Sequence, residues 1–117
     1  MIENKIQVMG ETWTIKEGSE QEFPALESMD GYTDTSTRTI VVSQMLEHQS
    51  EPTAKEKLSE YKKTVIRHEI IHAFLYESGL ENSSAGCTAW AVNEEMVDWI
   101  AIQAPKIIKV FLDLDLV

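Results

Sequence analysis

The sequence predicts an α+β fold, in which a small antiparallel sheet from the N-terminal half packs on a buried helix and on a second, C-terminal helix. In residues 1–50, apolar residues alternate with polar ones, as in strands that are buried on one face. The residues after 52 instead have the character of helices. A chain of 117 residues is enough for one compact domain, so we expect residues 1–117 to form a single domain.

The expected strands lie mainly in residues 1–50. Two alternating runs flank Gly10, which predicts a β-hairpin. The segment 39–43 is short and rich in β-branched residues, which favours a further strand. The apolar residues of the two alternating runs are Ile6, Val8, Trp13 and Ile15.

The first helix is expected over residues 53–79. Thr53 and Glu56 have the spacing of a capping box at its start, and Gly79 suits its C-terminal end. Its second half, residues 65–76, is apolar on almost every side, which predicts a buried segment. Charged groups and imidazoles inside such a segment need partners, because a polar group without one is costly to bury.

A second helix is expected over residues 88–103. Proline lacks a backbone N–H, so Pro105 is expected to interrupt this helix or to start a new turn. The tail, residues 106–117, fits either a helix or a strand, and its pattern does not separate the two.

Composition restricts the partners and the compartment. The formal charge is -10, which disfavours binding to nucleic acid or to an anionic membrane. The single cysteine, Cys87, allows no intramolecular disulfide and fits a reducing compartment. The N-terminus has no apolar signal-peptide core, and no apolar run approaches the ~20 residues that cross a bilayer. We therefore expect a cytoplasmic protein, with its oligomeric state open.

The segment from His68 to His72 reads HEIIH and matches the pattern H-E-x-x-H. Residues four apart on a helix lie about 40° apart around its axis, so both imidazoles point the same way and can ligate one zinc ion. Glu69 lies close enough to reach a water on the metal without ligating the ion. The alternative is that the histidines pack in the core and Glu69 pairs with a lysine.

Zinc in a catalytic site needs a third protein ligand and an open fourth position. Glu94 and Asp98 share a face of the second expected helix that is otherwise small and apolar. Glu95 lies at the margin of this face and is the reserve ligand. The alternative is that these glutamates are solvated surface acids.

The spacing N-E-x-x-x-D at Glu94 and Asp98, after H-E-x-x-H, resembles the gluzincin pattern of thermolysin-type metallopeptidases. The resemblance implies that His68, His72 and Glu94 are zinc ligands and that Glu69 is the catalytic base. It also implies that Asp98 is the carboxylate that orients His68.

A second resemblance is to the small ImmA/IrrE-type zincins of phages and mobile elements. It rests on Gly31-Tyr32, on the strand region 38–42, and on Val97 and Ala101 at fixed spacing after Glu94. It implies a minimal zincin-like fold and an origin in a phage or prophage. The chain departs from thermolysin in lacking the large second lobe, and from some ImmA/IrrE relatives in lacking a helix-turn-helix region.

These features predict a zinc-dependent endopeptidase that acts on a protein or peptide. The expected reaction is hydrolysis of the peptide bond by a metal-activated water, with Glu69 as general base. One alternative is an inactive metal-binding or protein-interaction module of the same fold. Another is zinc-dependent hydrolysis of a substrate that is not a peptide.

Four further features are candidates for the same site. Tyr76 lies one turn beyond His72 and can supply a hydroxyl to the oxyanion, or it is a tyrosine of the core or rim. His48 is a second candidate donor or a surface histidine. The strand at 39–43 is expected to lie beside the site as an edge, where an extended peptide can pair with it. Cys87 is an extra ligand or a small buried residue.

Overall fold

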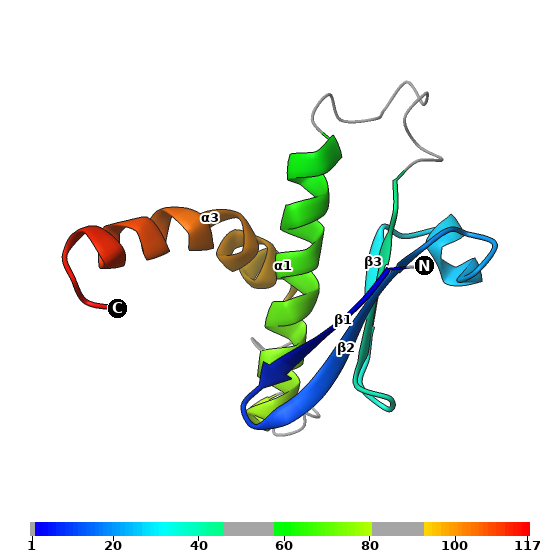
Figure 1. The fold of residues 1–117 in the computed structure, drawn as a ribbon, viewed down its shortest axis with the longest axis horizontal. Coiled ribbons are helices and arrows are strands. Elements are labelled where there is room, and N and C mark those ends of the chain that lie inside the picture. The colour runs from blue at the N-terminus through cyan, green and yellow to red at the C-terminus, as the bar shows by residue number, and fades with distance from the viewer. Residues whose placement is uncertain (1, 46–57, 81–92) are drawn as a thin grey trace.

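The computed structural model describes residues 2–45, 58–80 and 93–117. They form a four-stranded sheet, a short 3-10 helix and two long helices, which confirms the predicted α+β class (Figure 1). The elements are β1 (Ile2–Val8), β2 (Glu11–Gly18), η1 (Pro24–Glu27), β3 (Gly31–Asp34), β4 (Thr39–Ser43), α1 (Leu58–Glu77) and α3 (Glu94–Asp113).

The predicted hairpin is formed by β1 and β2, which pair antiparallel with Ile6 opposite Trp13. Met9 and Gly10 connect the strands with φ angles of 50° and 88°. Two residues with positive φ form the tight turn that matches the twist of paired strands, and glycine adopts this conformation without steric cost.

The sheet is mixed, so the prediction of an antiparallel sheet is wrong at one pairing. The strand order is β1-β2-β4-β3, and β2 runs parallel to β4 with Ile15 opposite Ile40. The reason is that residues 19–30 carry the chain past the position of β4, so that β3 forms the edge and β4 turns back between β3 and β2. The expectation that strand 39–43 is an edge is therefore also wrong, because β3 occupies that place.

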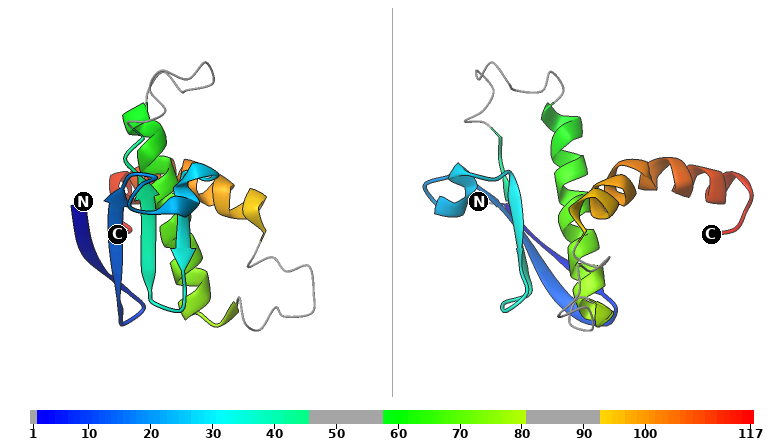
Figure 2. Two further views of the ribbon diagram at one scale, coloured as in Figure 1. Left: turned by 90° about the vertical axis from the view of Figure 1, so that its right-hand side faces the viewer. Right: turned by 180° about the vertical axis from the view of Figure 1, so that it is seen from behind.

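Helix α1 lies across one face of the sheet (Figures 1 and 2). Val65, Glu69 and Ala73, one turn apart, are its buried residues. The prediction that residues 65–76 form a buried segment holds for this stripe but not for the whole segment, because Phe74 is 43% exposed. One stripe faces the sheet and α3 crosses another part of the helix, so other faces meet solvent. The core beneath the stripe contains Val8, Trp13, Ile15, Ile40, Val42 and Met45.

The described part of α1 starts at Leu58, so the capping box at Thr53 and Glu56 lies outside the described residues. The helix ends at Glu77, close to the predicted boundary. Gly79 has a φ of 85°, and its N–H donates to the carbonyl of Tyr76. This confirms the prediction that a glycine ends the helix in the left-handed conformation.

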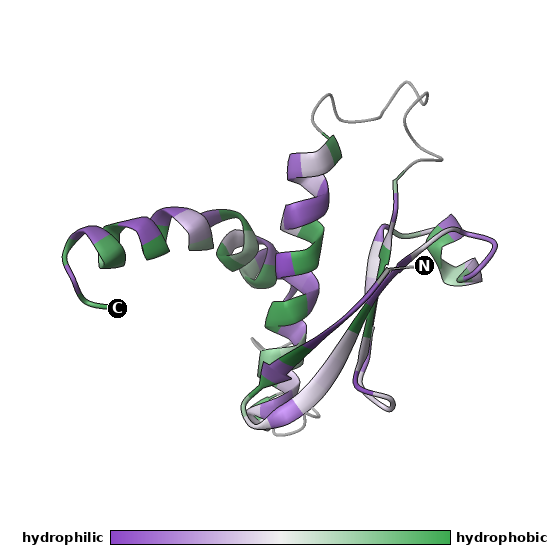
Figure 3. Ribbon diagram, viewed as in Figure 1, coloured by the Kyte–Doolittle hydropathy of each residue, from purple (hydrophilic) through white to green (hydrophobic). Residues whose placement is uncertain are grey.

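Helix α3 starts after Asn93, whose side chain accepts a hydrogen bond from the N–H of Met96. Residues 88–92 of the predicted helix lie outside the described residues. Pro105 does not interrupt α3, which continues to Asp113, so most of the tail is helix rather than strand. Apolar residues continue along it towards the C-terminus (Figure 3). Neither α1 nor α3 is long and apolar enough to cross a membrane.

Polar contacts attach α1 to the sheet at both ends. Near its N-terminus, the Tyr61 hydroxyl donates to Asp30 at 2.5 Å, and Lys62 forms an ion pair with Glu17. At its C-terminus, one oxygen of Glu77 accepts hydrogen bonds from Trp13 Nε1 at 2.9 Å and from Arg38 Nε at 2.6 Å. These contacts at both ends fix the orientation of α1 relative to the strands.

We expect Glu77→Gln to destabilise the fold in a way that depends on pH. The hydrogen bond from Arg38 holds the pKa of Glu77 below its usual value of 4.5. The stabilising contribution of the carboxylate is therefore fully present above the unfolded pKa and is lost as pH falls through the lower, folded pKa. Urea unfolding should show a stability difference between wild type and variant at neutral pH that shrinks as pH falls below 4.5. A difference independent of pH would contradict this account.

Candidate metal centre

Three side chains of types that can bind a metal ion converge from two helices beside the sheet. His68 and His72 lie one turn apart on α1, and Glu94 is the first residue of α3. One oxygen of Glu94 lies 2.9 Å from His68 Nε2, and the other lies 3.1 Å from His72 Nε2. One ligand atom of each residue lies within 4.8 Å of the other two, so the three are close enough to hold a metal ion.

The two imidazoles meet as the spacing of the motif requires. Their Nε2 atoms are 3.1 Å apart, and the ring centroids are 4.8 Å apart with an interplanar angle of 66°. Both side chains are largely buried, whereas the Glu94 side chain is 66% exposed. The donors therefore form a site that opens to solvent on the side of α3.

Asp98 lies one turn after Glu94 and contacts the other nitrogen of His68. Its Oδ1 is 2.6 Å from His68 Nδ1. A carboxylate accepts hydrogen bonds, so this contact favours the tautomer with the proton on Nδ1. The lone pair of His68 Nε2 is then directed at the space shared with His72 and Glu94, where a metal ion would be bound.

Glu69 is the buried carboxylate beside these donors, with 7% of the residue exposed. Thr33 Oγ1 donates to Glu69 Oε1 at 2.8 Å, and Glu69 Oε2 lies 4.0 Å from His68 Nε2. Burial raises the pKa of Glu69, and the hydrogen bond from Thr33 opposes this effect. One oxygen is thus held by the sheet while the other lies near the donor nitrogens.

Sequence reasoning missed Thr33. The signal available was its place two residues after Gly31, because alternate residues of a strand point to the same face. A Cβ on Gly31 would lie 3.0 Å from Val65 Cγ1, 3.1 Å from the carbonyl oxygen of Val41 and 3.5 Å from Glu69 Cγ. Gly31 thus allows β3 to approach α1 closely enough for Thr33 to reach Glu69.

The edge of β3 that pairs with no other described strand lies next to the donors. The N–H of Ser43 donates to the carbonyl of Asp30, which makes this a hydrogen-bonded pair of the antiparallel ladder. Because such pairs alternate along the ladder, the N–H and C=O groups of Gly31 and Thr33 point away from β4. A cavity of about 360 Å³ lies here, between β3 and the donors; its lining includes Gly31, Thr33, His68, Glu69, His72 and Glu94.

A second cavity, of about 490 Å³, borders His68 and Glu69. It lies between α1, α3 and the start of β3, and its lining includes Asp30, Tyr61, Thr64, Val65, Asp98 and Ile102. Space for a bound molecule therefore exists on two sides of the imidazole of His68.

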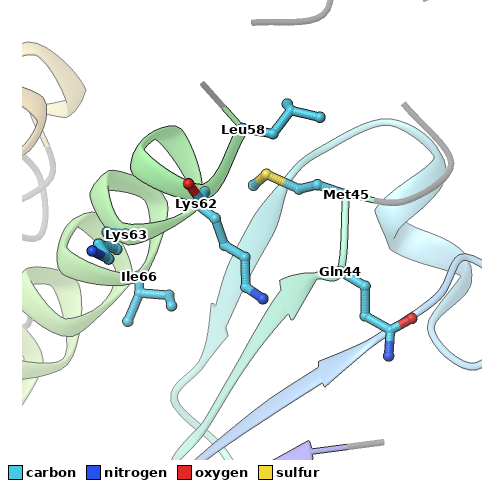
Figure 4. Close-up of a pocket in the computed structure, with 7 residues that line it drawn as sticks. Gln44, Met45, Leu58, Lys62, Lys63 and Ile66 are labelled. Carbon is cyan, nitrogen blue, oxygen red and sulfur yellow. The ribbon is translucent and has the colours of Figure 1, made fainter. Parts of the chain in front are cut away.

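A third cavity lies where β4 ends and the described part of α1 begins (Figure 4). Its volume is about 340 Å³, and Met45, Leu58 and Ile66 provide apolar lining. Its lysines, Lys62 and Lys63, form ion pairs with glutamates elsewhere. No histidine, cysteine or carboxylate is among its described lining residues, so it offers no usual metal ligand.

The remaining candidates do not line the two cavities beside His68, or they lie outside the described residues. Tyr76 packs edge-on against Trp13, with ring centroids 6.2 Å apart, and belongs to the periphery of the core. Each step of four residues along a helix turns the side-chain direction by about 40°. His72 is one such step from His68 and Tyr76 is two, so Tyr76 points towards the sheet rather than alongside His68. Glu95 is exposed and lies outside the metal-binding group. His48 and Cys87 lie outside the described residues.

Comparison with known proteins identifies the family. The model of the family described as BSP, peptidase of plants and bacteria, matches residues 14–110. This range runs from β2 into the second half of α3 and includes all the donors above. No curated protein and no solved structure matches the chain. Because the family model covers most of the sequence, the chain belongs to the family of peptidases of plants and bacteria.

Proposed function

We propose that this protein is a zinc-dependent endopeptidase in which His68, His72 and Glu94 bind the metal. The observation that carries the proposal is the convergence of these three donors, within 4.8 Å of one another, next to the buried carboxylate of Glu69. Membership of a peptidase family supports the same reaction class. The identity of the metal and the role of each residue are part of the proposal.

The donor set suits zinc. Two imidazoles and one carboxylate are a common ligand set of catalytic zinc sites, where a fourth position stays open. When bound, zinc polarises a carbonyl and makes a coordinated water more acidic. The contact of Asp98 with His68 Nδ1 is the outer contact that such a site requires, because it presents Nε2 to the metal.

Glu69 is the proposed general base. Its Oε2 lies 4.0 Å from His68 Nε2, so a water bound among the donors would be within its reach. Thr33 holds Oε1, which leaves Oε2 to accept the proton of the water and to pass it to the leaving amine. A purely structural site has no use for such a carboxylate, which argues against the inactive metal-binding module.

The edge of β3 is the proposed peptide-binding strand. The outward N–H and C=O groups of Gly31 and Thr33 can pair with an extended peptide and place its main chain beside the donors. This replaces the expectation for strand 39–43, which is enclosed between β2 and β3.

Among zinc peptidases, we propose that this protein belongs to the gluzincins, in which a glutamate is the third zinc ligand. Glu94 as the third ligand, with Asp98 one turn later at His68 Nδ1, supports this assignment. The described elements, one four-stranded sheet and two long helices, are consistent with the proposal of a minimal zincin without the second lobe of thermolysin.

We expect Glu69→Gln to reduce peptide hydrolysis by roughly 10²- to 10⁴-fold, the usual contribution of a general base. Glutamine keeps an acceptor for Thr33 but cannot take up the proton. Turnover of a fluorogenic peptide library and the zinc content of both proteins measure the effect. Zinc content should not change. Turnover within about twofold of wild type would exclude Glu69 as the base.

We expect His72→Ala to abolish zinc binding, because it removes one of three ligands. In the wild type, zinc at about 100 times its Kd should stabilise the fold by about 2.7 kcal/mol, provided that zinc binds only the folded state. Thermal unfolding with and without zinc measures this. Glu95→Ala, which changes a neighbouring exposed acid, is the matched control and should keep the zinc response. An equal response in His72→Ala would refute the ligand set.

We expect a peptide inhibitor with a zinc-binding group to form main-chain hydrogen bonds with Gly31 and Thr33 in a crystal structure. Methylating the inhibitor amide that faces β3 should weaken inhibition by up to roughly tenfold, since one hydrogen bond contributes about 0.5–1.5 kcal/mol. An inhibitor that binds without touching β3, or that tolerates the methyl group, would rule out strand pairing.

A further inference from the structure

Helix α3 has a proline in its interior, and this proline leaves one buried backbone carbonyl without its usual hydrogen-bond donor. It carries Glu94 and Asp98 at its start, and it has Pro105 in its interior. A proline lacks the N–H that would bond to the carbonyl four residues earlier, so the carbonyl of Ala101 has no partner from Pro105. Ala101 is fully buried, and a buried carbonyl without a partner is unfavourable.

Arg67 of α1 provides the missing donor. Its Nε donates to the carbonyl oxygen of Ala101 at 2.5 Å. Its Nη2 donates to Thr64 Oγ1 at 3.1 Å, and the hydroxyl of Thr64 in turn donates to the carbonyl of Glu60. The guanidinium is therefore held on α1 by one side and directed at α3 by the other.

This contact lies close to the proposed metal ligands on both helices. Arg67 directly precedes His68, and Ala101 lies almost one turn after Asp98. Val97 and Ala101 are fully buried on the face of α3 that meets α1. Each residue of sliding along a helix axis would move Glu94 by about 1.5 Å. Such a shift is enough to break its contacts of 2.9 and 3.1 Å with the histidines.

The freed carbonyl also gives this contact its specificity. In an uninterrupted helix, each inner carbonyl already accepts a hydrogen bond from the backbone N–H of the residue four positions later. Pro105 leaves one inner carbonyl available, and it is the one that Arg67 reaches. Further polar contacts between the described parts of α1 and α3 include those of His68 and His72 with Glu94, and that of His68 with Asp98.

We propose that Arg67 is a positioning residue: by binding the Ala101 carbonyl that Pro105 leaves free, it sets α3 on α1 so that Glu94 and Asp98 meet the histidines. This inference rests on the proposed metal site but not on peptidase activity. Arg67 acts through α3 rather than on the metal. It holds the helix that carries the third ligand before the metal arrives, which lowers the cost of assembling the site.

The test is a double-mutant cycle with Arg67→Met, Pro105→Ala and the pair of substitutions. In the wild-type background, Arg67→Met should weaken zinc binding by about tenfold, the lower end of what losing an outer contact costs a metal site. Competition with a chromophoric chelator measures the affinity. In the Pro105→Ala background, the backbone N–H restored at position 105 can donate a hydrogen bond to the Ala101 carbonyl. Arg67→Met should then weaken zinc binding by at most about twofold. Urea unfolding without zinc should show the same pattern.

Lys63→Met is the matched control, because it removes a cation from α1 four residues earlier whose ion pair is with Glu60 on the same helix. It should change zinc affinity by less than about twofold. If Arg67→Met is too unstable to assay, Arg67→Lys in the same cycle should show a smaller loss that also disappears with Pro105→Ala.

An equal loss in both backgrounds, or no loss in either, would overturn the inference. Failure of the proposed function looks different. Wild-type protein would then bind no zinc, or bind zinc without hydrolysing peptides, while the urea cycle would still report whether Arg67 and Pro105 are coupled.

Discussion

The burial of one stripe of α1 against the sheet sets the geometry of the whole site. Val65, Glu69 and Ala73 follow one another at four-residue spacing and face the strands. Because each residue of an α-helix turns by about 100°, His68 and His72 must then point to one side of this stripe. That side is where α3 crosses. The packing of the core therefore fixes the direction of both imidazoles before any ligand is bound.

The same packing buries the carboxylate of Glu69, and burying a charged group is energetically unfavourable. Glu69 lies within the buried stripe, and its position is stabilised by Thr33 of β3. Burial favours the protonated form and raises the pKa of Glu69, while a cation among the donors would favour the carboxylate. The net charge of -10 acts in the same direction by attracting cations. A metal ion at this place would thus offset the cost of gathering several acids around two histidines.

Features that follow from local periodicity could be predicted from the residues alone. The hairpin around Gly10, the shared face of His68 and His72, and the shared face of Glu94 and Asp98 all depend on short spacings. These predictions succeed because the rotation of a helix and the alternation of a strand are the same in every protein. The contact of Asp98 with His68 Nδ1, by contrast, was implied only by the resemblance to the gluzincins.

Features that join distant parts of the chain were decided by the packing of the domain. Periodicity says which face of a segment is apolar but not which strand lies beside it. The parallel pairing of β2 with β4, which leaves β3 at the edge beside Glu69, could therefore not be derived. For the same reason Thr33 was missed, and Tyr76 was open between site and core. Pro105 was expected to break a helix, because the donor that satisfies the freed carbonyl, Arg67, comes from 34 residues away. The local sequence shows that a proline removes one hydrogen bond from a helix. Only the packing of distant segments decides whether another donor replaces that hydrogen bond.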